Sequence, residues 1–74
     1  MRRAKDKPKQ VTFHLDELLE WRGLTLTELA NRVDITLVNL SVLKNNRARA
    51  IRFSTLEGLC KALDCQPGDL MTYE

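Results

Sequence analysis

The sequence is short of the residues that build metal, redox and catalytic sites. It has one histidine, His14, and two cysteines, Cys60 and Cys65, among its 74 residues. Two cysteines are too few for a disulfide framework, and with a single histidine they lack the companions that a zinc site needs. No Cys–His or Ser–His–Asp set falls on predicted rigid elements, and a core this small leaves no substrate-sized cleft. The sequence therefore predicts neither an enzyme nor a protein that needs a cofactor, metal or small-molecule ligand.

Long apolar runs are missing as well. No uninterrupted apolar stretch is long enough to cross a membrane. The first ten residues, MRRAKDKPKQ, are basic, but no apolar stretch follows them, so they do not form a secretory signal. A chain of this length makes one domain with a small core. We expect a cytoplasmic protein without membrane contact.

The two cysteines are best explained by packing. Cys60 lies on the apolar stripe that Leu56, Leu59 and Leu63 form at helical spacing, so it is expected in the core. Cys65 follows that helix and is expected to be buried too. A redox switch is the alternative, but no other feature of the sequence supports it.

Charge is unevenly distributed along the chain. Residues 1–10 carry five Lys or Arg and one Asp, whereas the rest has seven basic and nine acidic residues. Within that acidic remainder, no Asp or Glu occurs between Asp34 and Glu57, where Lys44, Arg47, Arg49 and Arg52 lie. A basic tail and a basic internal segment on an acidic domain suggest a side that faces a polyanion. The alternative is a solubilising tail and a solvated loop.

Hydrophobic spacing predicts an all-α fold, a compact bundle of four helices with a short C-terminal helical turn. The helices are expected at about residues 15–22, 25–33, 36–45 and 53–63, with the last turn starting at Pro67. Thr25 and Thr36 are candidate N-caps of the second and third helices, and Ser54 or Phe53 opens the fourth. Residues 11–13 and 71–74 are candidate extended ends. The expected organisation is a flexible basic arm, 1–10, followed by one domain, 11–74.

The second and third predicted helices form the informative pair. Only Asp34 and Ile35 separate them, so they must cross steeply, as in a helix-turn-helix. Ala30 is small where the helices approach, and Ile35 plugs the turn. We place this motif at about residues 25–45. The third helix also raises a question, because its outer side carries three aliphatic residues, Leu37, Val38 and Val42.

The stretch LTLTELANRVDITLVNLSVLKNN resembles the Cro/C1-type (phage repressor, lambda-repressor-like) helix-turn-helix family. Thr25, the Leu29–Ala30 pair, Ile35–Thr36 and Leu40–Ser41 occupy pattern positions of that family. The following RARAIRFSTLEGLCKALDCQPGDL is similar to the loop, fourth helix and terminal turn of a small bacterial and prophage subgroup. The resemblance covers about residues 11–73.

The resemblance implies a regulator that binds double-stranded DNA and inserts its third helix into the major groove. It implies three sets of contacts. Base edges would be met by Leu37, Val38, Val42 and Asn45, with Ser41 alongside. Phosphates would be met by Thr36 and Asn39, and by the start of the second helix at Thr25, Leu26 and Thr27. The basic segment would follow the backbone or minor groove with Lys44, Arg47, Arg49 and Arg52. Phe53 is expected instead to plug the core.

Two departures from the family change what this helix can read. Leu26 stands where the family often has Gln, and Leu37 stands where it often has Gln or Arg. With neither Gln nor Arg on its groove face, the third helix cannot read guanine bidentately. Asn45 can still pair with adenine, and the aliphatic side chains can pack on thymine methyl groups. This interpretation favours an A·T-rich major groove. The alternatives are that the face meets a protein partner, or that Leu37 or Val38 folds back on the core.

One protomer covers one half-site, so we expect the affinity to come from a two-fold homodimer, with half-sites about 34 Å apart along one face of the DNA. The candidate dimer surface is Leu70, Met71 and Tyr73, with Trp21 as a further candidate. The alternative to a dimer surface is that Leu70 lies in the core and that Tyr73 belongs to an unpaired tail. The arm, with Arg2, Arg3, Lys5, Lys7 and Lys9, is expected either to lie along a groove or to stay unbound.

Two functions follow. The first is a sequence-specific transcriptional regulator, most simply a repressor. The second is a protein-interaction module on the same fold, such as an antitoxin-like or anti-repressor partner; the apolar face of the third helix favours it, and the basic segment 44–52 opposes it.

Overall fold

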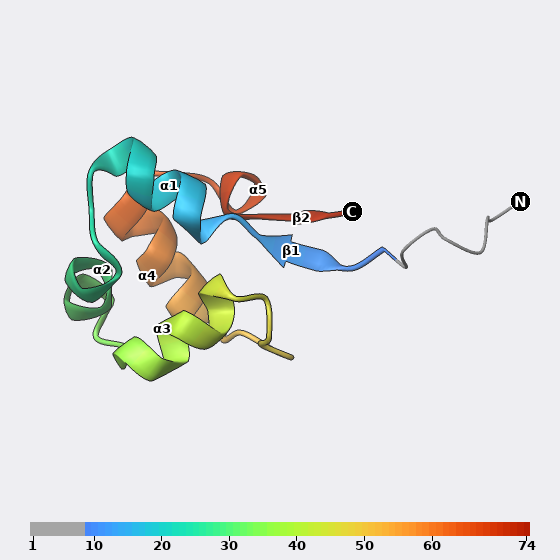
Figure 1. Cartoon of the computed structure of the whole chain (residues 1–74), viewed down its shortest axis with the longest axis horizontal. Coiled ribbons are helices and arrows are strands. Elements are labelled where there is room, and N and C mark those ends of the chain that lie inside the picture. The colour runs from blue at the N-terminus through green and yellow to red at the C-terminus, as the bar shows by residue number, and fades with distance from the viewer. Residues whose placement is uncertain (1–8) are drawn as a thin grey trace, which may run out of the picture.

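The computed structural model describes residues 9–74, so the predicted basic arm lies outside the described residues except for Lys9 and Gln10. Within residues 9–74, five helices follow a short strand, and a second strand comes last (Figure 1). The elements are β1 Val11–Phe13, α1 Leu15–Arg22, α2 Leu26–Val33, α3 Leu37–Lys44, α4 Phe53–Leu63, α5 Pro67–Leu70 and β2 Met71–Tyr73. The predicted helices are all present.

The helix ends follow local chemistry. Gly23 ends α1 with φ 66°, a left-handed conformation that glycine adopts without a Cβ penalty. Thr25 and Thr36 cap α2 and α3, as predicted. The fourth helix begins at Phe53, one of the two predicted starts, and its N-cap, Arg52, makes no side-chain cap bond. Ser54 therefore lies inside α4 rather than at its cap.

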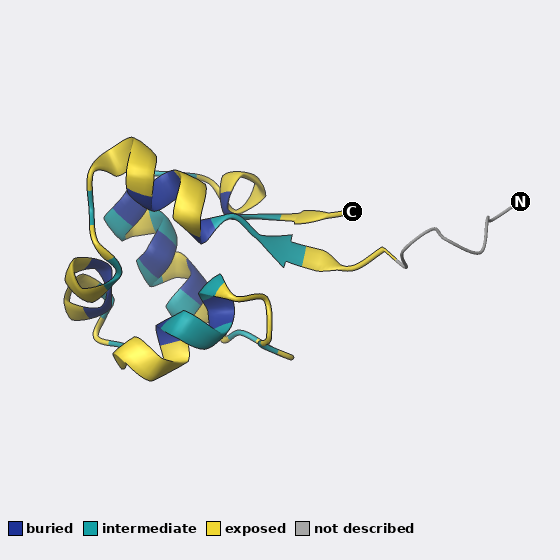
Figure 2. Cartoon of the chain, in the orientation of Figure 1, coloured by how far each residue is buried: buried dark blue, intermediate teal, exposed yellow. Residues whose placement is uncertain are grey.

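A leucine-rich core joins the helices, and Figure 2 shows its residues along their inner faces. Each leucine fully removed from water contributes about 1.5–3 kcal/mol before entropy is counted. The buried residues are Leu15, Leu18, Leu19, Leu29, Ala30, Leu40, Leu43, Leu56, Leu59, Leu63 and Leu70. Cys60 and Cys65 are half-buried against this cluster. Burial raises the pKa of the Cys65 thiol to about 11, with Cys60 adding to the rise.

Phe53 was predicted to plug the core, and that prediction is wrong. Its side chain is 79% exposed. The buried stripe of α4 begins one turn later, at Leu56, so the first turn projects beyond the core. Ala48 and Ile51 from the preceding loop pack against the core in its place.

The mostly helical fold agrees with the all-α prediction, but the two predicted extended ends pair into a small sheet. The strands β1 and β2 form an antiparallel two-stranded sheet with Val11 opposite Tyr73, Thr12 opposite Thr72 and Phe13 opposite Met71. Backbone bonds between Gln10 and Glu74, 2.8 and 3.0 Å long, extend the ladder by one pair. The fold is thus mostly helical with a small sheet beside α5 (Figure 1). Within residues 9–74, no helix is both long enough and apolar enough to span a bilayer.

Candidate nucleic-acid interface

The helices α2 and α3 form the predicted helix-turn-helix. Asp34 ends α2 in a left-handed conformation, with φ 59°. This reversal lets the Ile35 amide donate to the carbonyl of Ala30, 3.2 Å away, which closes the end of α2 and turns the chain into α3. Ile35 packs partly buried against the core. Leu29 and Leu40, both fully buried, hold the two helices against the rest of the bundle.

A capping box fixes the start of α2. The amide of Glu28 donates to Thr25 Oγ1 at 3.1 Å, and the amide of Thr25 donates to Glu28 Oε1 at 2.9 Å. The hydrogen bond from the Thr25 backbone lowers the pKa of the Glu28 carboxyl, and the Thr25 hydroxyl contributes to the same shift. The start of α2 therefore already holds one negative charge. Next to it, Thr27 is exposed, whereas Leu26 is half-buried against the core.

The outer face of α3 carries apolar side chains into solvent. Val38 is 73% exposed and Leu37 is 46% exposed, so neither folds back on the core. Val42 is half-buried. Of the three aliphatic residues on this face, Leu37 and Val38 protrude into solvent, and Val42 lines a cavity beside the helix.

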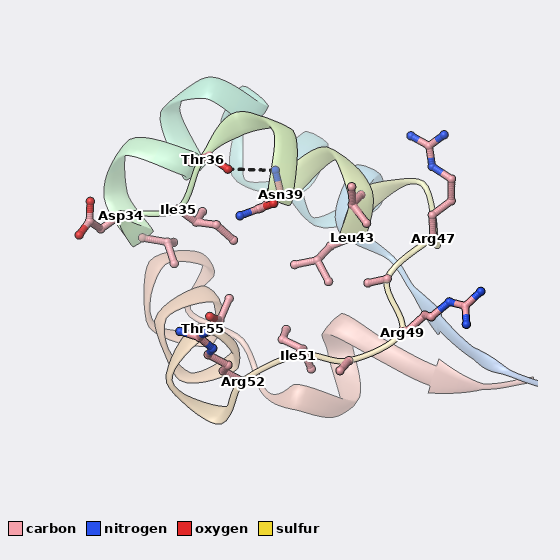
Figure 3. A pocket seen from close by; sticks show the side chains of 14 residues that line it. Asp34, Ile35, Thr36, Asn39, Leu43, Arg47, Arg49, Ile51, Arg52 and Thr55 are labelled. Carbon is pink, nitrogen blue, oxygen red and sulfur yellow. Dashed lines mark hydrogen bonds between the residues drawn. The ribbon is translucent and has the colours of Figure 1, made fainter.

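That cavity lies between α3 and the loop 45–52 and has a volume of about 580 Å³. Asn39 and Val42 line it from the helix, and three arginines line it from the loop: Arg47, Arg49 and Arg52. Figure 3 shows Arg47 and Arg49 extending outward from the loop, while Arg52 lies beside Thr55. Thr36 caps α3 at the same site by accepting from the Asn39 amide, 3.1 Å away. The structure therefore brings the predicted base-reading helix and the predicted basic segment to one surface.

Two predicted DNA contacts are engaged within the chain. Lys44 Nζ lies 3.4 Å from Asp16 Oδ1 on α1, so its charge is directed to that helix. Asn45 ends α3, and its Nδ2 donates to Ser41 Oγ at 3.3 Å. Asn45 remains exposed, and this single long bond leaves its amide oxygen available.

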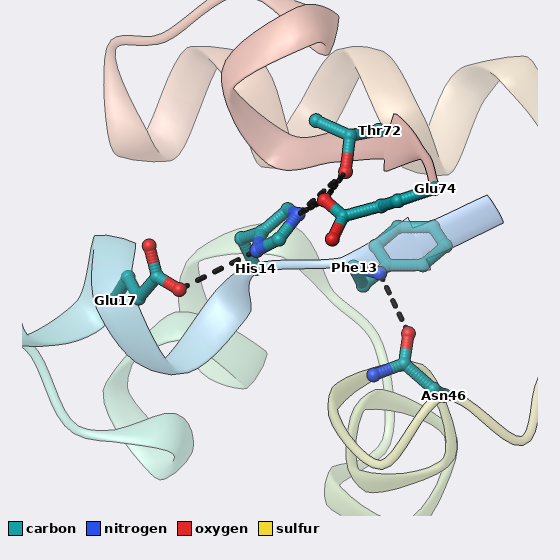
Figure 4. A network of polar contacts seen from close by, with 6 residues as sticks. All are labelled: Phe13, His14, Glu17, Asn46, Thr72 and Glu74. Atoms are coloured by element: carbon teal, nitrogen blue, oxygen red, sulfur yellow. Dashed lines mark hydrogen bonds and ion pairs between the residues drawn. The ribbon is translucent and has the colours of Figure 1, made fainter. Parts of the chain in front are cut away.

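Asn46 is a positioning residue whose contact the sequence did not reveal. It has φ 59°, a left-handed geometry that asparagine tolerates, and its Oδ1 accepts from the Phe13 amide at 2.6 Å (Figure 4). This bond ties the loop after α3 to β1. No local signal pairs residues 13 and 46, because the contact depends on how the sheet docks.

His14, the solitary histidine, joins the two ends of the fold (Figure 4). Its Nε2 lies 2.7 Å from Thr72 Oγ1 and 3.3 Å from Glu74 Oε2, and its Nδ1 lies 3.4 Å from Glu17. Hydrogen bonding by Thr72, with a smaller contribution from His14, lowers the pKa of the Glu74 carboxyl. The histidine thus helps to hold β2 in place.

The candidate dimer residues occupy different environments. Leu70 is fully buried, so its side chain is in the core, the alternative that the sequence left open, and offers no surface to a second copy. Met71 is half-buried, and Tyr73 is 69% exposed. The Lys9 ammonium lies 5.7 Å from the centre of the Tyr73 ring. Dimer formation through Met71 and Tyr73 stays a prediction.

Comparisons with known proteins agree with this geometry. The family model for the Cro/C1-type HTH DNA-binding domain matches residues 14–74. An uncharacterized HTH-type transcriptional regulator, YozG of Bacillus subtilis (strain 168), is 54% identical over 63 residues, covering 85% of this chain and 75% of its own. The crystal structure of the transcriptional regulator VanUg superimposes with a TM-score of 0.75 at 21% identity, covering 100% of this chain and 97% of that one, which supports the fold. The chain therefore belongs to the Cro/C1-type helix-turn-helix family of DNA-binding domains, a family of transcription regulators rather than enzymes.

Proposed function

We propose that this protein is a sequence-specific repressor that inserts α3 into the major groove of an operator half-site. The observation that carries the proposal is the exposed outer face of α3 beside a cavity lined by Arg47, Arg49 and Arg52. A helix in the major groove meets base edges, and a basic loop beside it meets the adjoining phosphates. Occupancy of a promoter by such a domain represses transcription by excluding the polymerase.

The outer face of α3 favours A·T pairs. Val38 and Leu37 are exposed aliphatic residues that can pack on thymine methyl groups. Asn45 supplies an amide able to pair with the N6 and N7 atoms of adenine. Because α3 bears no Gln or Arg, it has no bidentate donor for guanine. The half-site read by this helix is therefore A·T-rich.

Phosphate contacts fix the position of α3 in the groove. Arg47 and Arg49 extend outward from the loop (Figure 3). On bound DNA they contact the phosphate backbone on one side of the helix. The exposed Thr27 and the first amides of α2 approach the backbone on the other side, although the Glu28 carboxylate in the capping box weakens that site for an anion. Thr36 and Asn39 flank the groove-facing side of α3. Lys44 contributes only if its ion pair with Asp16 opens.

A protein-interaction module is the second candidate. The exposed Val38 and Leu37 favour it, because neighbouring apolar side chains on the outer face of a helix suit a protein partner. The loop opposes it: between Asp34 and Glu57 the chain carries basic side chains and no acidic one. A surface of that charge suits a polyanion better than an average protein.

A duplex-binding titration across salt concentrations separates the two functions. About four to six phosphate contacts per protomer predict that affinity falls by about two to three orders of magnitude between 50 and 200 mM salt. Selection of bound duplexes from a random pool then identifies the site, and an A·T-rich motif is expected. Absence of duplex binding at low salt would overturn the repressor proposal and favour the interaction module.

The charge contribution needs a matched control. Arg49→Ala and Lys61→Ala each remove one exposed positive charge, but Lys61 lies in the last turn of α4, away from the cavity beside α3. Arg49→Ala is expected to weaken binding, and Lys61→Ala to leave it nearly unchanged. Equal losses would mean that net charge alone, rather than this face, binds DNA.

A further inference from the structure

The loop 45–52 also borders a second hollow, a groove of about 280 Å³ between this loop and the sheet. Three apolar side chains of the sheet line one wall of the groove: Val11, Phe13 and Met71. Three apolar side chains of the loop line the other wall: Ala48, Ala50 and Ile51. The groove is therefore apolar on both sides.

The chain itself holds the two walls in place. Phe13, Met71 and Ile51 are half-buried against the core. Asn46 ties the loop to β1, because its Oδ1 accepts from the Phe13 amide at 2.6 Å. Val11 is 55% exposed at the open end of the groove, so a ligand there would cover apolar surface that the chain leaves in water. The groove is preformed, as sites for small molecules usually are.

The lining has one charged residue among the described residues, Arg49. Arg49 is exposed and extends outward from the loop, so its guanidinium lies at the mouth of the groove (Figure 3). A guanidinium pairs with a carboxylate through two parallel hydrogen bonds. Apolar walls with a single cation at the mouth therefore fit a ligand with an apolar tail and a carboxylate head. The groove lies just below the usual range of about 300–1,000 Å³ for ligand sites, so this ligand is small.

We propose that the groove binds a small apolar carboxylate, such as a medium-chain fatty acid, and that this ligand weakens DNA binding. The groove and the cavity beside α3 share part of their lining: Ala48, Arg49, Ala50 and Ile51. The coupling rests on the proposed function, in which Arg49 contacts a phosphate. Once its guanidinium is paired with the carboxylate, Arg49 no longer offers a net positive charge to the DNA. Because such coupling is reciprocal, bound DNA weakens the ligand by the same factor.

This site departs from the sequence-based expectation, which included no small-molecule ligand. The walls come from residues 11–13, 46–51 and 71, and only the folded chain brings these segments together. No local pattern therefore indicates the groove.

Isotope-edited NMR of the whole chain without DNA tests binding, with octanoate as the probe. Octanoate is expected to shift the amides of Phe13, Ala48 and Met71 saturably, with a dissociation constant of about 0.1–1 mM for a ligand of about ten non-hydrogen atoms. Octanol has the same tail without the charge and is expected to bind about tenfold more weakly. Acetate has the head without the tail and is expected to cause no saturable shift.

Three results of this titration would overturn the proposal. The first is the absence of a saturable shift at the groove amides. The second is equal affinity for octanoate and octanol. The third is that the groove amides shift with protein concentration rather than with octanoate, which would mean that a second copy of the chain fills the groove.

Three variants locate the ligand. Arg49→Gln keeps the side-chain length without the charge and is expected to bind octanoate and octanol alike. Val11→Ser removes part of the apolar wall and is expected to weaken octanoate several-fold. Trp21→Ser is the control, because Trp21 is 68% exposed and stacks on Arg22, outside the groove. Unchanged octanoate affinity in both groove variants, or an equal loss in Trp21→Ser, would overturn the assignment. A urea midpoint for each variant checks that it is folded.

Titration of the selected half-site duplex tests the coupling, with acetate replacing octanoate in the reference at equal ionic strength. Saturating octanoate is expected to weaken wild-type binding about fivefold or more, and to lower the salt slope by about 1 because one phosphate contact is lost. Val11 lines the groove but not the cavity beside α3, so Val11→Ser should keep its duplex affinity and need several-fold more octanoate for the same effect. Equal duplex affinity of the wild type with and without octanoate would overturn the coupling. If the wild type binds no duplex at all, the proposed function fails, and the NMR titration still decides whether the groove binds the carboxylate.

Discussion

The amide of Phe13 donates to Oδ1 of Asn46 at 2.6 Å, and this bond joins the first strand to the loop that follows the groove-facing helix. Asn46 itself sits at φ 59°, so one residue supplies both the turn geometry and the attachment. The loop that carries Arg47 and Arg49 is thereby held at a defined position relative to α3. This hydrogen bond therefore links the sheet to the loop of the candidate DNA surface.

Replacing Asn46 separates its two roles. Asn46→Gly keeps the positive φ but loses the hydrogen bond, so a loss of about 1 kcal/mol of unfolding free energy is expected. Asn46→Ala loses the bond and also strains the backbone, adding about 1–2 kcal/mol. Urea unfolding of both variants measures the difference. Equal stability of the two variants would mean that the left-handed geometry is not needed.

Packing of the apolar face of α3 on thymine can be tested by removing the thymine C5-methyl group. Replacing thymine by uracil in the selected site removes the C5-methyl, and wild-type affinity is expected to fall because Val38 loses its contact. Val38→Ala is expected to lose less affinity on this replacement than wild type does, because only the contact made by Leu37 remains. Because Val38 is exposed, this variant should unfold within about 0.5 kcal/mol of wild type. Equal sensitivity of the two proteins to the methyl group would contradict thymine packing by this residue.

Asn45 and Arg49 are expected to act on different properties of binding. Asn45→Ala should reduce the preference for the selected half-site over a random duplex by about 1–3 kcal/mol. Arg49→Ala should weaken binding to both duplexes alike and lower the salt slope by about 1. Half-site duplexes are used so that each measurement reports one protomer on one site. If neither variant changes affinity, the assigned DNA face is wrong.

The capping box predicts a pH dependence of stability. Thr25 lowers the pKa of the Glu28 carboxyl from its ordinary value of 4.5, so the folded state favours the ionised form. This contribution is complete above pH 4.5 and is lost as pH falls through the lowered pKa. Glu28→Gln keeps an oxygen for the Thr25 amide but does not titrate.

Urea unfolding between about pH 3 and 6 should therefore show a shallower acid loss in Glu28→Gln than in wild type. Some loss is expected to remain in the variant, because hydrogen bonding by Thr72 also lowers the pKa of Glu74. Parallel pH profiles for the two proteins would show that ionisation of Glu28 in the capping box contributes nothing to the free energy of unfolding.

Local patterns in the sequence predicted the helices well. Thr25 with Glu28, Thr36 with Asn39 and Gly23 at a positive φ all act through neighbours within four residues. The steep crossing of α2 and α3 followed from the short linker between them. The protruding Val38 was also foreseen from helical spacing.

Features that depend on distant partners were missed. The pairing of Val11 with Tyr73 joins opposite ends of the chain, and two three-residue strands carry little signal of their own. Phe53 was misplaced because an aromatic residue at a helix start suits a core equally well by pattern. Its exposure depends on where the loop residues Ala48 and Ile51 pack. The Lys44–Asp16 ion pair likewise depends on how α1 lies against α3.

Isotope-edited NMR on the protein bound to its selected half-site tests the central claim most directly. If α3 enters the major groove, the Val38 methyl protons will show contacts to thymine methyl protons, and the amides of Thr36 and Asn39 will shift on binding. If instead the Val38 resonances stay unchanged while DNA shifts the amides around Trp21, another face binds the duplex and the assignment of α3 is wrong.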